Sequence, residues 1–121
     1  MPLKQIDNKI EKYPAEAAIG IISGKWKAMI LFHLMKEIYR FNELKRLLPK
    51  ISQRMLTNQL RELEADGLVY RKIYAEVPPK VEYSLTKRGQ AVRPVLAELR
   101  RLGENIQNNM RMDKVSNDKT F

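Results

Sequence analysis

Residues 51–67 read ISQRMLTNQLRELEADG, and this stretch predicts a helix with one apolar and one polar side. Ser52 is a residue type favoured at an N-cap, and Gly67 suits the left-handed position that ends a helix. We therefore expect a helix over about residues 52–66. Its apolar residues recur at the spacing of one helix face, which we expect to be buried: Met55, Leu56, Leu60 and Leu63.

The other side of this helix carries side chains that donate hydrogen bonds. At about 100° per residue, Arg54, Asn58 and Arg61 lie opposite the leucines, Thr57 lies beside them, and Gln53 is in the first turn. Side chains of these types suit base edges and phosphates in the major groove of DNA. We take them as candidate DNA contacts. The alternative is an ordinary solvated face of an amphipathic helix.

A short helix is predicted immediately before this one. Residues 42–48 carry leucines at helical spacing, and Pro49 ends the pattern. A short helix, a turn and a longer helix therefore follow one another, which is the order of a helix-turn-helix. We expect three leucines of the short helix to face inward: Leu44, Leu47 and Leu48.

The apolar period changes from 3.6 to 2 after the longer helix, and residues 69–85 predict a β-hairpin. The turn falls at Pro78 and Pro79, which cannot continue a central strand. A helix-turn-helix followed by such a hairpin predicts a winged helix, so the expected fold class is mainly α with a small β-hairpin (α+β). Lys80 at the hairpin tip and Lys72 nearby are expected to approach the minor groove or the phosphate backbone.

Two further helices are predicted nearer the N-terminus. Pro14 suits the first turn of a helix that ends near Ile22. Residues 25–35 predict a second helix with a buried stripe of Trp26, Ile30, Leu31 and Leu34. Residues 39–41 are expected to form a short strand. Three basic residues of this region join the candidate DNA contacts: Lys25, Lys27 and Arg40.

Thr86 is a good N-cap and predicts a last helix over about residues 87–109. Pro94 lies inside this range, where it either kinks the helix or marks its true start. An apolar stripe at heptad-like spacing predicts a dimer interface, formed with the N-terminal helix: Val92, Val95, Leu96, Leu99, Leu102 and Ile106. Alternatively the stripe packs on the N-terminal helix of the same chain. Residues 1–110 are expected to form one domain and 111–121 a disordered tail.

The composition is that of a basic, cysteine-free chain of one domain's length. Lys and Arg number 23 against 14 Asp and Glu, and the formal net charge of +9 favours an anionic partner such as nucleic acid. Without Cys there are no disulfides or thiolate metal sites, and His33 is the only histidine. We expect no metal, no cofactor and no enzyme activity. No stretch reaches the roughly 20 apolar residues that span a bilayer, so we expect a cytoplasmic protein without a membrane partner.

Five stretches, in this order, resemble the HxlR-type branch of winged-helix transcriptional regulators, which is related to the MarR group. They are Ile22–Lys27, Arg40–Leu44, Leu48–Thr57, Leu60–Val69 and Tyr74–Thr86. The resemblance implies a homodimeric regulator that binds double-stranded operator DNA, usually as a repressor. It also implies that Lys80 is on the wing and that five residues face the major groove: Ser52, Gln53, Arg54, Thr57 and Asn58.

Winged helices also serve as protein-binding modules, because a fold does not determine a function. In this alternative, the polar face of Arg54, Asn58 and Arg61 binds an acidic protein surface instead of DNA. The discriminating observation is whether bound DNA fragments share a sequence.

The signal that such a regulator would sense is left open by the sequence. Many HxlR-type proteins carry a Cys directly before the proline of the first helix, whereas this chain has Tyr13 before Pro14. Thiol-based sensing therefore cannot be carried over. A small apolar effector in a groove between the first and last helices is one alternative, with Tyr13, Ile19, Trp26 and Leu99 as candidate lining residues. A filled interface without a ligand is the other.

Overall fold

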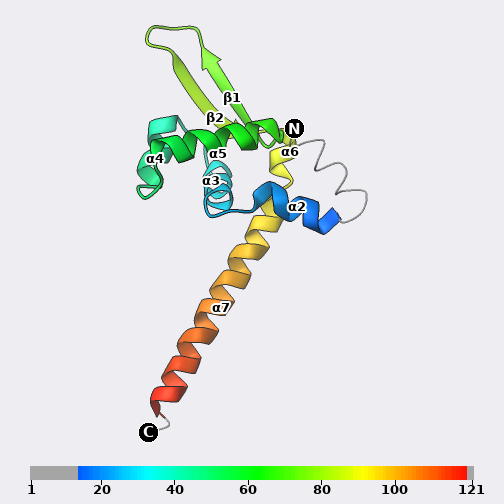
Figure 1. Ribbon diagram of the computed structural model, residues 1–121, viewed down its shortest axis with the longest axis vertical. Coiled ribbons are helices and arrows are strands. Elements are labelled where there is room, and N and C mark those ends of the chain that lie inside the picture. The colour runs from blue at the N-terminus through cyan, green and yellow to red at the C-terminus, as the bar shows by residue number, and fades with distance from the viewer. Residues whose placement is uncertain (1–13, 120–121) are drawn as a thin grey trace. The chain divides into compact units, whose positions relative to one another are not determined.

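The computed structural model describes residues 14–119, which fall into two compact units. The first unit ends at Ala91 and the second begins at Val92. The first unit contains, in order, α2 (Pro14–Ile22), α3 (Lys27–Leu34), α4 (Phe41–Leu47), α5 (Gln53–Ala65), β1 (Val69–Tyr74), β2 (Lys80–Leu85) and α6 (Lys87–Gln90); the second contains α7 (Arg93–Lys119) (Figure 1).

The core of the first unit forms where α3, α4, α5 and the start of the hairpin meet. Leu56, Leu60 and Leu63 of α5 are each no more than 1% exposed. They are joined by fully buried side chains from the neighbouring segments: Ile30, Leu31, Leu44, Ile51 and Val69. Burial of each such side chain stabilises the fold by about 1.5–3 kcal/mol relative to leaving it in water. The predicted apolar stripe of α5 is confirmed for its three leucines.

Both ends of α5 are built as the sequence predicts. The Ser52 side chain accepts a hydrogen bond from the Met55 N–H at 3.0 Å, so it is an N-cap. Gly67 adopts a φ of 78°, in the left-handed region. Glycine adopts this conformation at the lowest cost because it has no Cβ. The helix is therefore bounded to residues 53–65 by its own sequence.

The wing is a two-stranded antiparallel hairpin that extends away from α5 (Figure 1). Val69 pairs with Leu85 at its base and Tyr74 with Lys80 near its tip. The strand expected at residues 39–41 is reduced to one bridge, in which Tyr39 exchanges backbone hydrogen bonds with Tyr83. It is this short because α4 already begins at Phe41.

The last helix predicted over residues 87–109 is in fact two helices. Thr86 is an N-cap, as expected, since its hydroxyl accepts the Gly89 N–H at 2.9 Å, but it caps only the four residues of α6. A new helix, α7, begins at Arg93 with Pro94 in its first turn, where proline needs no N–H partner. Of the two readings of Pro94, the start of a helix is the one found.

Three further expectations about exposure and order are corrected. Leu47 and Met55, expected to be buried, are 42% and 40% exposed, because they lie at the edges of the apolar faces of their helices. Residues 111–119, expected to be disordered, continue α7 as far as Lys119.

Gly89 allows α6 to approach the end of α5 more closely than any other residue would. A Cβ added to Gly89 would lie 2.1 Å from the carbonyl oxygen of Leu68, which is backbone and cannot rotate away. We expect Gly89→Ala to lower the free energy of unfolding by about 3 kcal/mol, measured by urea denaturation. Gly20→Ala is the control: a Cβ there meets nothing within 4 Å among residues 14–119, so the change should stabilise α2 by at most about 1 kcal/mol. Equal stabilities for the two variants would contradict the close approach.

Candidate nucleic-acid interface

The buried leucines of α5 leave one polar face outside. Gln53, Arg54, Asn58 and Arg61 are all exposed and follow one another along this face. We call these four residues the reading face. They were predicted as DNA contacts, and the structure brings them together on one helix. Ser52 is also exposed, although one lone pair of its hydroxyl is already used for the cap.

Thr57 lies at the edge of the reading face and is half-buried. Its hydroxyl donates a hydrogen bond to the backbone carbonyl of Gln53 at 2.9 Å. The hydroxyl proton is therefore used within the helix, and the oxygen is left as an acceptor. Thr57 also lines a hollow between α5 and the hairpin, as does Arg61 of the reading face.

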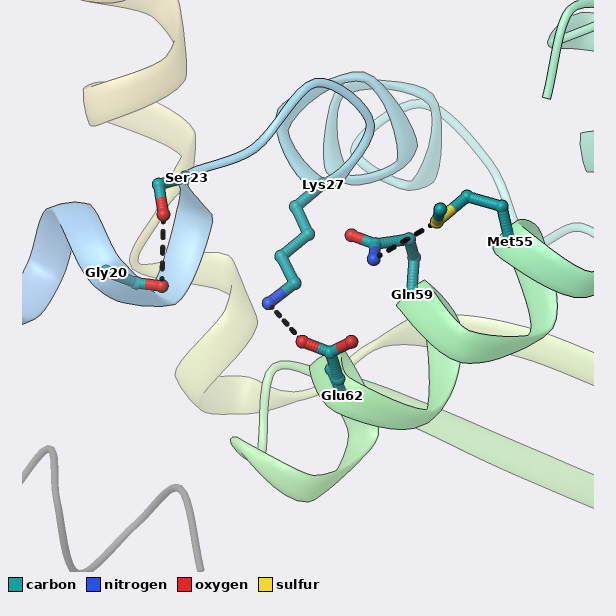
Figure 2. Close-up of polar contacts among 6 residues, drawn as sticks. All are labelled: Gly20, Ser23, Lys27, Met55, Gln59 and Glu62. Atoms are coloured by element: carbon teal, nitrogen blue, oxygen red, sulfur yellow. Dashed lines mark hydrogen bonds and ion pairs between the residues drawn. The ribbon is translucent and has the colours of Figure 1, made fainter.

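Lys27 is not on the surface, which corrects its prediction as a DNA contact. It is 8% exposed, and its Nζ lies 2.9 Å from Oε1 of Glu62 on α5 (Figure 2). This charged hydrogen bond joins α3 to α5. A buried ammonium needs such a partner, because an unpaired charge is costly in the interior. We therefore leave Lys27 out of the proposed interface.

Asp66, directly after α5, is a second buried charge near this pair. It is 5% exposed, and within residues 14–119 its Oδ1 has no hydrogen-bond partner. Burial raises the pKa of the Asp66 carboxyl, and the Glu62 charge adds to the rise, although Lys27 and Arg88 oppose it. The end of α5 therefore carries a carboxylate that the fold only partly compensates.

On the wing, the side chains of Lys72 and Lys80 both lie over the ring of Tyr74. Their Nζ atoms are 4.8 and 4.7 Å from the ring centroid. The Tyr74 hydroxyl donates to Oε1 of Glu82 at 2.7 Å, and Lys80 lies 3.5 Å from the other oxygen of that carboxylate. The Tyr74 hydrogen bond and the Lys80 charge lower the pKa of Glu82. Both predicted wing lysines are thus oriented by one tyrosine.

Arg71 is a candidate contact that sequence reasoning missed. It alternates with Lys72 along β1 and therefore points to the opposite face of the hairpin, toward α5. Its Nε lies 3.6 Å from Oε2 of Glu64 on α5. The sequence did contain a signal for this position. Arg71 is two residues after the buried Val69, so both side chains lie on the same face of the strand, the face that meets α5.

The two remaining predicted contacts are exposed but lie on other elements. The Lys25 Nζ is 5.0 Å from the centroid of the Trp26 ring, just before α3. Arg40 precedes α4, and its backbone N–H donates to Oε1 of Glu43 at 2.7 Å. Arg40 and Lys80 line the same hollow of about 660 Å³ between α4 and the hairpin. Arg40 is therefore next to the wing, whereas Lys25 belongs to neither α5 nor the wing.

Among residues 14–119, no group of three or more His, Cys, Asp or Glu side chains is placed to hold a metal ion. Burial, with a smaller effect of Lys36, lowers the pKa of His33. No single described helix has the length and apolar content needed to cross a bilayer. Only α2 and α3 taken together have that length and apolar content, and they are bent by 79° relative to each other. Of the expected effector-lining residues, Tyr13 lies outside the described range.

A helix-turn-helix, a capped recognition helix and a β-hairpin wing define the winged-helix class of transcriptional regulators. The chain belongs to the HxlR-like helix-turn-helix family, which matches residues 21–111. One relative is the HTH-type transcriptional regulator YdeP of Bacillus subtilis, 50% identical over 105 residues that cover 87% of this chain and 80% of YdeP. The expected family and the expected function, a DNA-binding transcriptional regulator, are confirmed at this level.

Solved structures agree with the family. The reduced form of the redox regulator HypR is 46% identical, with a TM-score of 0.78 over 82% of this chain and 98% of that one. The reduced form of YodB from B. subtilis is 36% identical, with a TM-score of 0.67 over 73% of this chain and 86% of that one. HypR is described as a redox regulator, but the present chain has no cysteine.

The buried Asp66 carboxylate makes stability depend on pH. Its raised pKa means that the folded chain binds this proton more tightly than the unfolded chain, where the ordinary value is 3.8. Ionised Asp66 therefore costs stability at neutral pH, and the cost disappears as the pH falls through the raised pKa toward 3.8. We expect Asp66→Asn to be more stable than wild type at pH 7 and equal to it near pH 3.8 in urea titrations.

Asp113→Asn removes the same charge from an exposed position of α7 and is the control. It should change stability by no more than about 0.5 kcal/mol at any pH. A stability difference between wild type and Asp66→Asn that grows in acid would show that the sign is wrong.

Proposed function

We propose that the chain is a homodimeric, sequence-specific regulator that represses transcription, with α5 in the major groove of double-stranded DNA and the wing on the minor groove or backbone. The observation that supports this most is the reading face, a row of donor side chains on a helix whose other side is held by buried leucines. A rigid helix with an outward row of donors suits base reading.

The proposal divides the candidate residues by chemistry. Arg54 suits the two acceptors of a guanine, and Gln53 and Asn58 suit the donor and acceptor of an adenine. The remaining candidates, all exposed except the half-buried Lys80, are proposed as contacts to the sugar–phosphate backbone, which position the protein without reading sequence: Ser52, Arg61, Lys72, Lys80, Lys25 and Arg40. The net charge of +9 supports an anionic ligand.

The proposed dimer rests on the apolar stripe of α7. Val95, Leu99, Leu102 and Ile106 are 46–55% exposed, and Met110, further along, is 66% exposed. Large apolar side chains in a continuous row are typical of an interaction surface. Leu96, predicted in the same stripe, is 4% exposed within the single chain and is therefore left out, and Val92 is half-buried. Two recognition helices related by a two-fold axis would read half-sites about 10 bp apart.

We further propose a cytoplasmic location, because the proposed ligand is genomic DNA. Neither catalysis nor a membrane partner is part of the proposal. A small-molecule effector between the first and last helices stays a prediction from the expected positions of those helices.

Arg54 and Lys80 should affect DNA binding in different ways. Arg54→Ala should cost about 1–3 kcal/mol on the preferred sequence and relax the preference at one base position. Lys80→Ala should weaken binding to all duplexes by a similar factor and lower the salt slope by about 0.9 for each of the two copies in the dimer. The measurement is selection of bound sequences from a random duplex pool, followed by fluorescence anisotropy at several salt concentrations. Identical losses on every sequence would remove Arg54 from base reading, and the absence of any enriched sequence would favour the protein-binding alternative.

The stripe of α7 should set the oligomeric state. Light scattering should give the wild type a mass of twice 14.2 kDa, and Leu102→Asp should reduce it to one copy, because a carboxylate would be buried without a partner in the interface. Asn108→Asp is the control, since it adds the same charge to the opposite side of α7. A single-copy wild type, or dissociation of both variants, would contradict the proposed dimer surface.

A further inference from the structure

A small polar hollow lies at the junction of the recognition helix and the wing. It has a volume of about 290 Å³ and is lined by Thr57, Leu60, Arg61, Glu64, Arg71 and Tyr83. Two guanidinium groups and one carboxylate therefore surround it, which leaves a net positive charge. Leu60 is buried in the core and forms part of its lining.

The side chains of this hollow come from two elements whose spacing the fold determines. Arg61 belongs both to the hollow and to the reading face, so the hollow continues the surface proposed to contact DNA. Arg71 comes from β1 on the other side, where strand alternation turns it toward α5. The two arginines therefore approach the same space from a helix and from a strand.

Arg71 is held there only loosely. Its Nε lies 3.6 Å from Glu64 Oε2, which is an ion pair but longer than a good hydrogen bond, and both side chains are partly exposed (44% and 39%). An exposed pair of this kind contributes at most about 1 kcal/mol. An anion with better geometry can therefore replace Glu64 as the partner of the guanidinium, because a phosphate accepts both arms of the fork.

Tyr83 adds a neutral donor to the same space. Burial raises the pKa of its hydroxyl, so the proton stays on the oxygen at neutral pH. The hollow thus offers two charged forks and one hydroxyl donor, and all three groups suit the oxygens of a phosphate.

The geometry points to a seat for one backbone phosphate of double-stranded DNA in this hollow, with Arg61 and Arg71 as its charged partners. This inference rests on the proposed function, because it takes α5 to lie in the major groove. One DNA strand borders the major groove that α5 occupies. Its sugar–phosphate backbone then passes the side of α5 on which the wing lies. The seat would set the angle between the recognition helix and the duplex, since α5 and β1 both bind the same phosphate.

The test uses a duplex selected from the random pool and a scrambled duplex of the same length. Arg71→Gln should lower the slope of log affinity against log salt by about 0.9 per side chain, or about 1.8 for the two copies in the proposed dimer, which shrinks the affinity ratio between 50 and 200 mM salt by about twelvefold. The loss should be equal on the two duplexes. Arg101→Gln, which removes the same charge from an exposed position of α7, should leave the slope unchanged.

Neutral methylphosphonates placed one at a time in the duplex locate the phosphate. One position in each half-site should weaken binding by the wild type and weaken binding by Arg71→Gln less, because that variant has lost one of the two charged partners of the phosphate. Arg71→Lys should keep the slope while losing affinity, and Glu64→Gln should raise affinity for every duplex by freeing Arg71. Thermal unfolding confirms that each variant is folded.

An Arg71→Gln variant with the slope and methylphosphonate profile of the wild type would overturn the seat while leaving the proposed function intact. A wild type that binds no duplex at any salt concentration would remove the proposed function and the seat with it.

Discussion

The packing of Leu56, Leu60 and Leu63 determines the rotation of α5 about its own axis, and the rest of the surface follows from that rotation. A turn by one residue, about 100°, would expose a leucine and bury a charged or amide side chain. Each exchange costs the burial of a large apolar side chain and adds an unpaired polar group, which amounts to several kcal/mol. The outward position of Arg54 and Asn58 is therefore a consequence of the core, not of their own contacts.

An ion pair and hydrogen bonds then fix the position of α5 relative to its neighbours. The ion pair between Lys27 and Glu62 joins it to α3 on one side, over a separation of 35 residues in the chain. At its far end the Thr86 hydroxyl donates to the carbonyl of Gly67, and the Arg88 guanidinium donates to the carbonyl of Asp66. The helix proposed to read bases is thus attached at its side and at its end, so the wing that follows it begins at a defined place.

Local signals predicted local structure well. The limits of α5 could be read from Ser52 and Gly67, and the hairpin from its period of two, because caps and periodicity act within a few residues. The break between α6 and α7 could be predicted only as one of two readings of Pro94, since the apolar spacing of the stripe continues across residues 91 and 92 without interruption. The family resemblance, and not periodicity, carried the prediction of a transcriptional regulator.

Placement of charges depended on contacts that no local pattern contains. Lys27 and Lys25 are alike in sequence, but within residues 14–119 only Lys27 meets a carboxylate from a distant helix. Arg71 was overlooked for a related reason: strand parity placed it on the α5 side, and only the fold shows that this side carries a polar hollow at its edge. Exposure at the edges of helices, as for Leu47, likewise depends on where the neighbouring elements end.

The four-residue helix α6 has a consequence for how the chain folds. A helix this short does not form in an isolated segment, because nucleation fixes several dihedral angles for a single hydrogen bond, and Gly89 weakens it further. Its turn exists because Thr86 and Gly89 dock on residues 67 and 68, about twenty positions earlier. The appearance of α6 during folding should therefore coincide with completion of the long-range contacts, and amide protection of Gly89 and Gln90 would report tertiary structure instead of helix propensity.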